Sequence, residues 1–189
     1  MKRTSLSHHP CSIARTLDIV GEWWTPLILR DIAYGIRRFG EIQEDLGISA
    51  NVLTDRLEAL SRHGLLEARV YQERPQRHEY HLTEKGAELI PALLALMQWG
   101  DRWTWADGTG PVRVVHEECG HEVRVEVDCP HCKRNVAIDE LRAKPRAALP
   151  PSLPGPATQP GQQQSGQQRP GEVSGRRLYT AEHGVPLGA

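Results

Sequence analysis

The chain has 189 residues, of which 39% are hydrophobic and 25% charged, and its formal net charge is −1 at pH 7. Residues 145–189 are rich in Pro, Gly and Gln and lack apolar periodicity, so we expect a disordered tail there. No apolar run approaches the roughly 18 residues that a membrane helix needs, and the amino terminus lacks the apolar core of a signal peptide. The composition therefore argues against a membrane protein and predicts a soluble, cytoplasmic protein with one small folded domain.

The first third of the chain reads as a short arm followed by three helices. Residues 1–10 lack a pattern, and we expect a flexible arm. Apolar residues then recur at helical spacing from Cys11 to Val20. Thr25 and the following proline predict the N-cap and first position of a second helix, which ends near Gly35. A third helix is predicted from Phe39 to Leu46.

The next helix follows a glycine turn and is strongly amphipathic. Gly47 supplies the turn, Ser49 is the expected cap, and Leu53, Leu57 and Leu60 form the buried stripe. The opposite face carries Asn51, Thr54, Asp55, Glu58 and Arg62. That face is either an ordinary solvated surface or the reading surface of a DNA recognition helix, and periodicity alone does not separate the two.

A predicted hairpin favours the second interpretation. The runs Leu65 to Tyr71 and His78 to Leu82 alternate as strands, and the loop between them carries Arg74 and Arg77. An amphipathic helix, a glycine stop and a basic hairpin in this order predict a winged helix-turn-helix. The expected fold class is therefore mainly α with a small β-wing.

A long helix is predicted after the hairpin, with Thr83 as its cap. Its apolar stripe contains Leu89, Leu93, Leu96 and Met97, and Trp103 continues it. The stripe could be core or a dimer seam. Because so small a domain would otherwise expose much apolar surface, we favour the seam.

The net charge of −1 does not by itself suggest a nucleic-acid partner. The position of the charges matters more, because arginines gather around the predicted helix-turn-helix and hairpin. These arginines are Arg37, Arg38, Arg56, Arg62, Arg69, Arg74 and Arg77.

The chain resembles the HxlR-type family of bacterial winged-helix regulators, relatives of the MarR-like group. The resemblance runs from Cys11 to about Trp103, and we assign residues 11–107 to this domain. Its marks, in order, are Cys11-Ser12-Ile13, Gly21-Glu22-Trp23-Trp24, Leu27-Ile28-Leu29-Arg30, Arg38-Phe39-Gly40-Glu41-Ile42, Leu53-Thr54-Asp55-Arg56-Leu57, Gly64-Leu65-Leu66 and Tyr80-His81-Leu82-Thr83-Glu84-Lys85-Gly86. Glu22, Trp24 and Pro26 depart from the pattern at the start of a scaffold helix.

The resemblance implies a homodimeric, nucleoid-associated transcription factor, a repressor that binds a palindromic operator on double-stranded DNA. The amino- and carboxy-terminal helices would pair the subunits. The implied DNA contacts are Asn51 and Thr54 to bases, Arg38, Arg56 and Arg62 to phosphates, and Arg74 and Arg77 from the wing.

Cys11 stands alone at the start of the first predicted helix. On the residues alone, a small apolar filler is the favoured interpretation. The resemblance strengthens the rival interpretation, because several such regulators use a cysteine here to sense oxidants or electrophiles, and helix-terminal amides stabilise a thiolate.

Residues 112–138 carry the other three cysteines. Two valine-rich runs, 112–115 and 123–127, predict a hairpin. A structural Zn²⁺ site is predicted from His116, Cys119, Cys129 and Cys132, which are spaced as two knuckles. His121 is the substitute fourth ligand, and His131 is less favoured. Free thiols on a small hairpin are the alternative.

A rival function comes from the Cys-Pro-His-Cys sequence at residues 129–132, which would suit a thiol–disulfide redox protein. That chemistry requires the first cysteine at a helix amino terminus within a βαβ framework, and too few structured residues are predicted here. No nucleophile–base pair, phosphate-binding loop or paired-carboxylate motif is evident. We therefore expect a protein that is not an enzyme.

Overall fold

The computed structural model describes residues 5–7 and 9–144, so the expected tail at 145–189 lies outside the described residues. The helices are α1 (Ser12–Val20), α2 (Trp24–Ala33), α3 (Phe39–Leu46), α4 (Ala50–Arg62), α5 (Glu84–Ala87), α6 (Ile90–Thr104) and the 3₁₀ helix η1 (Ile138–Glu140). The strands are β1 (Leu66–Glu73), β2 (Gln76–Leu82), β3 (Asp128–Cys129) and β4 (Arg134–Asn135). None of the described helices is long and apolar enough to cross a membrane.

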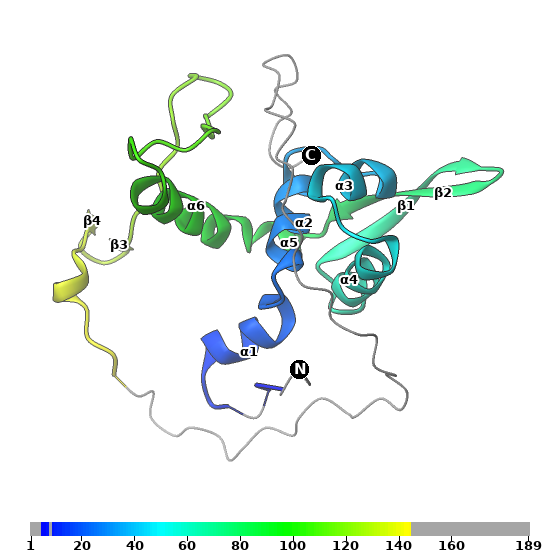
Figure 1. The fold of residues 1–189 in the computed structure, drawn as a ribbon. Helices are drawn as coiled ribbons and strands as arrows, with labels where there is room; N and C mark the ends of the chain where they lie inside the picture. Colours follow the sequence, from blue (N-terminus) through cyan, green and yellow to red (C-terminus); the bar gives the residue numbers. More distant parts are fainter. Residues whose placement is uncertain (1–4, 8, 145–189) are drawn as a thin grey trace.

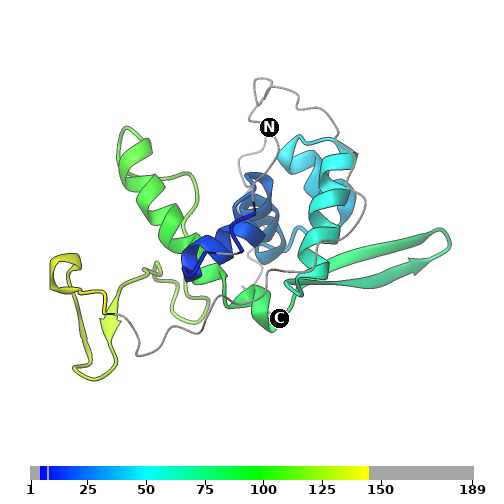
Figure 2. The ribbon, with the colours of Figure 1, turned by 90° about the horizontal axis from the view of Figure 1, so that it is seen from below.

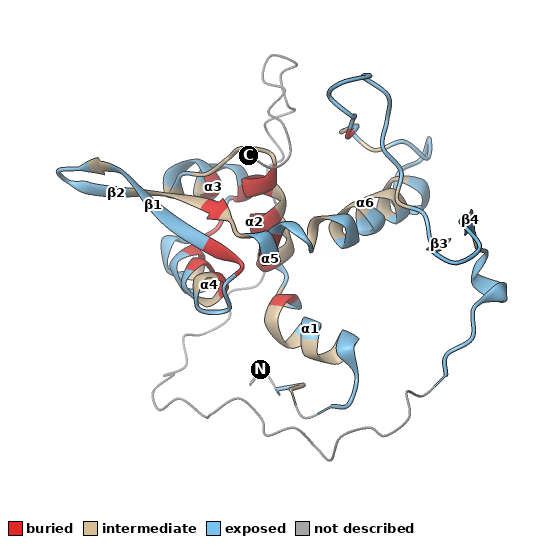
Figure 3. Cartoon of the chain, turned by 180° about the vertical axis from the view of Figure 1, so that it is seen from behind, coloured by how far each residue is buried: buried red, intermediate tan, exposed pale blue. Residues whose placement is uncertain are grey.

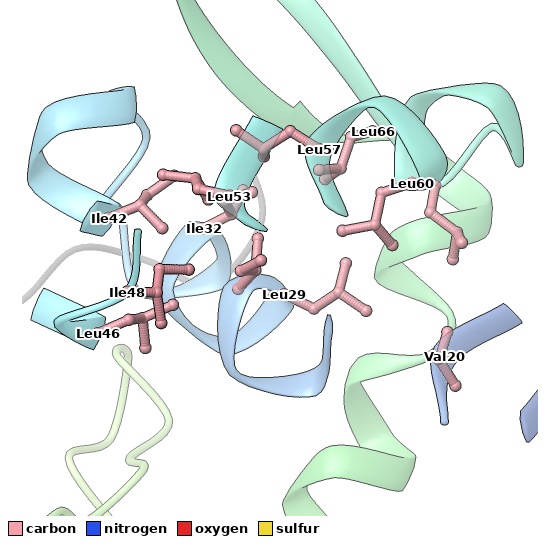
Figure 4. Close-up of a cluster of buried hydrophobic side chains, with 12 residues drawn as sticks. Val20, Leu29, Ile32, Ile42, Leu46, Ile48, Leu53, Leu57, Leu60 and Leu66 are labelled. Atoms are coloured by element: carbon pink, nitrogen blue, oxygen red, sulfur yellow. The ribbon is translucent and has the colours of Figure 1, made fainter. Parts of the chain in front are cut away.

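The hydrophobic core lies between α2, α3, α4 and the base of the hairpin (Figure 4). Its side chains include Ile28, Leu29, Ile32, Ile42, Leu46, Ile48, Leu53, Leu57, Leu60, Leu65 and Leu66. Burying each such side chain contributes roughly 1.5–3 kcal/mol. Leu53, Leu57 and Leu60 therefore anchor α4 in the core, and the opposite, polar face of the helix is exposed (Figure 3).

The turn between α3 and α4 forms as the sequence predicts. Gly47 adopts φ 63°, a left-handed conformation that glycine takes without strain, and its N–H donates to the carbonyl of Gln43 at 3.0 Å. The Ser49 Oγ then accepts a hydrogen bond from the Val52 N–H at 3.4 Å, which caps α4. The predicted helix-turn-helix is confirmed.

The start of α2 differs from the prediction. The helix begins at Trp24, one residue before Thr25, which is buried within the first turn. The N-cap residue is Trp23, and its side chain makes no capping hydrogen bond. Glu22, just before it, accepts the Trp24 N–H with its carboxylate at 3.2 Å and the Thr25 N–H with its carbonyl at 2.9 Å.

The hairpin of β1 and β2 projects from the domain on the side away from α6 (Figures 1 and 2). The strands pair antiparallel with an irregularity between Val70 and Gln72, and both extend closer to the tip than predicted. At the base, the Thr83 N–H donates to the Leu65 carbonyl at 3.1 Å. The predicted wing is confirmed.

The long helix predicted after the wing is interrupted. Thr83 caps α5 as expected, with its Oγ1 accepting the Gly86 N–H at 3.1 Å, but α5 ends at Ala87 and α6 begins at Ile90. Pro91 explains the break, because it has no N–H to continue the helix and is tolerated only in a first turn.

Helix α1 begins at Ser12, with Cys11 as its N-cap residue. The described part of the expected arm contacts this helix, because the Leu6 N–H donates to Asp18 Oδ1 at 2.8 Å.

The predicted hairpin after residue 107 is only partly formed. Val115 and Glu122 form an isolated bridge, but the second valine run does not continue the ladder. Instead the Gln98 side chain of α6 accepts the Val125 N–H at 3.1 Å and donates to the Val123 carbonyl at 3.3 Å. The Gln98 side chain therefore makes the hydrogen bonds to Val123 and Val125 that a second strand would make in a longer hairpin.

Candidate nucleic-acid interface

The outward face of α4 is the centre of the candidate interface. Asn51 and Thr54 are exposed in its first half, and Arg62 is exposed at its end. Because Leu53 and Leu57 anchor the opposite face in the core, these polar side chains are held outward. An exposed polar amino-terminal half of this helix is suited to reach base edges in a major groove.

Arg38 is held at the junction of α3 and the wing. Its Nε lies 2.9 Å from Glu79 Oε1, its Nη1 lies 3.8 Å from Glu41 Oε1, and its guanidinium lies 4.6 Å from the ring centre of Tyr71. The hydrogen bond to Glu79 raises the pKa of Arg38 above its usual value. Arg38 is thus a fixed cation whose charge is already partly balanced.

The structure brings Arg38 and Arg77 to one hollow. That hollow is also lined by Phe39 and Gly40, the first two residues of α3, and by Tyr71. Free N–H groups at a helix start favour an anion, and two arginines strengthen this preference. The hollow is therefore suited to a phosphate of a nucleic-acid backbone.

The wing tip and the end of α4 carry three of the predicted arginines. Arg74 and Arg77 are exposed on either side of Pro75 and Gln76 at the tip. Arg62 lines a second hollow, between α4 and the wing. Cations thus lie at the end of α4 and along the neighbouring wing.

Arg56 is separated from the other six predicted residues. It is half-buried, and its Nη1 lies 3.9 Å from Glu22 Oε2 in the segment before α2. Helical geometry explains this position, since Arg56 is two residues beyond Thr54 and so projects from a different side of α4.

Sequence reasoning missed the two residues that position Arg38, namely Tyr71 and Glu79. Both lie on the wing, far along the chain from Arg38. The Arg38–Glu79 bridge between backbones brings them together. No local pattern could have revealed this contact, because it depends on how the wing packs against α3.

The cysteines fall in three places. Cys11 is exposed at the start of α1, which does not agree with a buried filler. The predicted metal ligands lie in two separate turns, His116 and Cys119 in one and Cys129 and Cys132 in the other. Among residues 5–7 and 9–144, no three His, Cys, Asp or Glu side chains lie close enough together to hold a metal ion.

Cys129 ends β3, and Cys132 lies in the turn between β3 and β4. Backbone N–H groups of Cys132 and His131 lower the pKa of Cys129 below its usual value. However, a tight turn between two-residue strands replaces the helix amino terminus that thioredoxin-like chemistry requires. The geometry does not favour the redox alternative.

A helix-turn-helix with arginines at the wing tip, a polar helix face and flanking arginines defines a DNA-binding regulator of the winged-helix class. Residues 19–107 match the family model described as HxlR-like helix-turn-helix. The chain belongs to this family of transcriptional regulators, as the resemblance predicted.

Relatives support the same conclusion. An HTH-type transcriptional regulator of Mycobacterium tuberculosis (strain H37Rv) is 39% identical over 134 residues, which are 71% of this chain and 85% of the relative. A contiguous stretch of that length must include residues 56–134 of this chain wherever it begins, so the similarity extends beyond the winged helix.

Two solved structures are similar to the chain. PA1607, described as a candidate transcription factor, is 37% identical with a TM-score of 0.67, over 75% of this chain and 99% of its own. PA1374 of Pseudomonas aeruginosa, also described as a candidate transcription factor, is 39% identical with a TM-score of 0.53, and the match covers 74% of this chain and 94% of PA1374.

Proposed function

We propose that the protein is a homodimeric repressor that binds a palindromic operator in chromosomal DNA. The observation that carries this proposal is the exposed amino-terminal face of α4, flanked by arginines of the wing and of the α3 junction. Two such faces related by a two-fold axis would contact successive major grooves, one half-site each.

Within each half-site we assign two kinds of contact. Asn51 and Thr54 read bases, because Asn pairs bidentately with adenine and Thr contacts either base edges or the thymine methyl group. Arg38 and Arg77 bind a phosphate at the start of α3, and Arg62, Arg74 and Arg56 extend the contact to the backbone. Arg56 contributes from the flank beside Glu22.

The subunits pair through α1 and α6 in this proposal. Ile13 and Leu17 of α1 and Leu96, Trp99 and Trp103 of α6 are between 46% and 71% exposed. Those of α6 are spaced as one stripe at i, i+3 and i+7, so a second copy can cover them together.

The assignment of bases and phosphates is tested by two variants on the same operator. Asn51→Ala should reduce discrimination at one operator position, by about 1–3 kcal/mol, and leave the salt dependence unchanged. Arg77→Ala should weaken binding to all sequences alike and lower the salt slope by about 1. If Asn51→Ala keeps full operator discrimination, the assigned reading face is wrong.

A repressor acts by occupying DNA that the polymerase needs. Deleting the gene should therefore raise transcription from the promoter that carries the operator, and Asn51→Ala should have the same effect. A fall in transcription would contradict the repressor assignment while leaving DNA binding intact.

We also propose that Cys11 is the site through which oxidants or electrophiles release the protein from DNA. Its thiol is exposed at the start of α1, a helix assigned to the dimer seam, so modification there would change the spacing of the two α4 helices. Cys11→Ser should bind DNA normally in reducing buffer and resist release by diamide. Equal release of both proteins would exclude this role.

A further inference from the structure

Two turns beyond the winged helix have the same backbone geometry. In the first, the Gly120 N–H donates to the His116 carbonyl at 2.7 Å, and in the second the Lys133 N–H donates to the Cys129 carbonyl at 2.7 Å. Each turn therefore spans four residues that begin and end with a candidate metal ligand. The turn that ends at Cys119 and the turn that ends at Cys132 are built alike.

The residue after each turn has the same left-handed conformation. Gly120 has φ 68°, and Lys133 has φ 53°, the sole positive φ of a non-glycine residue among the described positions. A lysine adopts this conformation at a cost of about 1–2 kcal/mol, so the second turn keeps its shape against the preference of its own residue. The repeated backbone geometry indicates that the two turns have the same structural role.

The two ligands of the first turn already face each other. His116 Nδ1 lies 3.3 Å from Cys119 Sγ. Bonds of about 2.1 Å to nitrogen and 2.3 Å to sulfur at a tetrahedral angle would place these atoms about 3.6 Å apart. In the second turn the Cys132 N–H points at Cys129 Sγ, 3.5 Å away, and such a hydrogen bond would stabilise a thiolate ligand.

We propose that these turns are two halves of one structural Zn²⁺ site, formed within a single chain by His116, Cys119, Cys129 and Cys132. The halves stand apart in this structure (Figure 1). The nine residues 120–128 that connect them could span up to about 30 Å, which leaves ample length to bring both turns onto one ion. Binding Zn²⁺ replaces the three thiol protons and couples metal affinity to the folding of the segment.

If one Zn²⁺ ion joins the two turns, the residues that carry them would be attached to α6, the helix that we propose for dimerisation. The Gln98 amide of α6 already binds Val123 and Val125, which lie between the two turns. Val114, just before the first turn, is buried. A closed site would therefore fix both turns relative to α6, in addition to the contacts that Gln98 already makes.

The experiment measures Zn²⁺ in the full chain and its variants, with Co²⁺ absorption reporting the ligand set. One Zn²⁺ per chain is expected, with Co²⁺ spectra typical of a tetrahedral sulfur-rich site. Cys119→Ser and Cys132→Ser should weaken binding by more than about 100-fold, because even loss of an outer hydrogen-bonding partner costs 10–100-fold. His116→Ala should weaken it comparably.

Matched histidine variants provide the controls. His121→Ala and His131→Ala should retain Zn²⁺, since neither side chain belongs to the proposed site. Chelation should speed amide hydrogen exchange in residues 112–136 and leave α4 unchanged. This second readout separates loss of the site from general unfolding.

Three results would overturn the proposal. The chain could bind no Zn²⁺ while Cys129 and Cys132 oxidise reversibly, which would favour a redox dithiol. It could bind one ion per two chains, which would exclude a site within one chain. Finally, His121→Ala could lose the metal while His116→Ala keeps it, which would refute the assigned ligand set.

Discussion

Gly86 joins the wing to the helices that follow it. The glycine is buried where α5 passes the base of β1, and a methyl group placed on it would overlap the backbone carbonyl of Leu65. Because that carbonyl already accepts the Thr83 N–H, it cannot move freely. The close approach of the two backbones therefore requires glycine.

Gly86→Ala should accordingly destabilise the domain by about 1–3 kcal/mol, as other forced overlaps in packed regions do. The matched control is Gly40→Ala in α3, where an added methyl group meets no atom within 4 Å. This control should be neutral or stabilising by up to about 1 kcal/mol. Urea denaturation of both variants measures the difference, and equal stabilities would refute the close-approach argument.

Asp31 is a fully buried carboxyl group in α2. Its Oδ1 accepts two hydrogen bonds from Arg30, at 2.9 and 2.6 Å, yet burial outweighs this interaction and raises the pKa of Asp31 from 3.8 to about 7. A raised pKa means that the folded state binds the proton more tightly than the unfolded state. Ionisation of Asp31 therefore lowers stability as pH rises from about 4 to about 7.

Asp31→Asn should remove this loss, because the amide stays neutral. The free energy of unfolding of the variant, relative to the unsubstituted protein, should rise between pH 5 and pH 8, by at most about 4 kcal/mol. Asp55→Asn, at an exposed position of α4, is the control variant. A difference that does not change with pH would mean that Asp31 is ionised throughout this range.

Single residues differ in how far the sequence reveals them. Ser49 and Thr83 were predicted as caps because capping depends on a few neighbouring positions. The roles of Asp31 and Gly86 depend on which distant backbone packs against them. Such roles become visible only when the fold is known.

At the scale of elements, the wing and α3 are joined by a charged contact that affects DNA binding. Glu79 of β2 pairs with Arg38 at 2.9 Å and so balances part of the charge that a phosphate would meet. Arg77, in the same hollow, is exposed at the wing tip. The two arginines should therefore contribute unequally to the electrostatics of binding.

Arg77→Ala should lower the slope of log affinity against log salt by about 1, and Arg38→Ala by clearly less. Glu79→Gln should increase both affinity and slope, because it frees the charge of Arg38. Fluorescence anisotropy over a salt series measures all three variants. Equal slopes for the two arginine variants would show that the pair with Glu79 is broken on DNA.

Elements with a strong period were predictable, and interruptions were not. The buried stripe of α4 and the alternation of the wing strands gave the correct elements. One continuous helix was predicted from Thr83 to Trp103, because the apolar stripe runs along that whole stretch. The structure divides it just before Pro91, which has no N–H to continue a helix. In the second valine run the Val123 N–H still donates to the Val114 carbonyl at 2.9 Å, but the Val125 N–H donates to Gln98, a tertiary contact that alternation cannot show.

At the scale of the molecule, α6 lies on the side away from the wing (Figures 1 and 3) and carries exposed apolar side chains. Leu96, Trp99 and Trp103 of α6 are 64%, 61% and 65% exposed. Leu93 of α6 packs against the core formed by α2, α3 and α4, whereas these three side chains stay outside it. The wing side thus carries the proposed DNA contacts, and the opposite side carries the surface that we propose for a second copy.

Leu96→Glu should convert the protein to a monomer, because burying an unpaired carboxylate in an apolar seam costs several kcal/mol. Sedimentation velocity at micromolar concentration measures this change. Val70→Glu is the control, since Val70 is 48% exposed on the wing and should leave the oligomeric state unaltered.

The same variant separates dimerisation from DNA reading. On a probe with two half-sites, Leu96→Glu should lose at least about 100-fold in affinity, because two linked contacts exceed one by 10²–10⁴. On a single half-site it should bind as the unsubstituted protein does, since Asn51 and Arg77 are unchanged. A Leu96→Glu protein that stays dimeric would place the subunit interface elsewhere. A monomer that loses half-site binding as well would show that α6 also supports the reading surface itself.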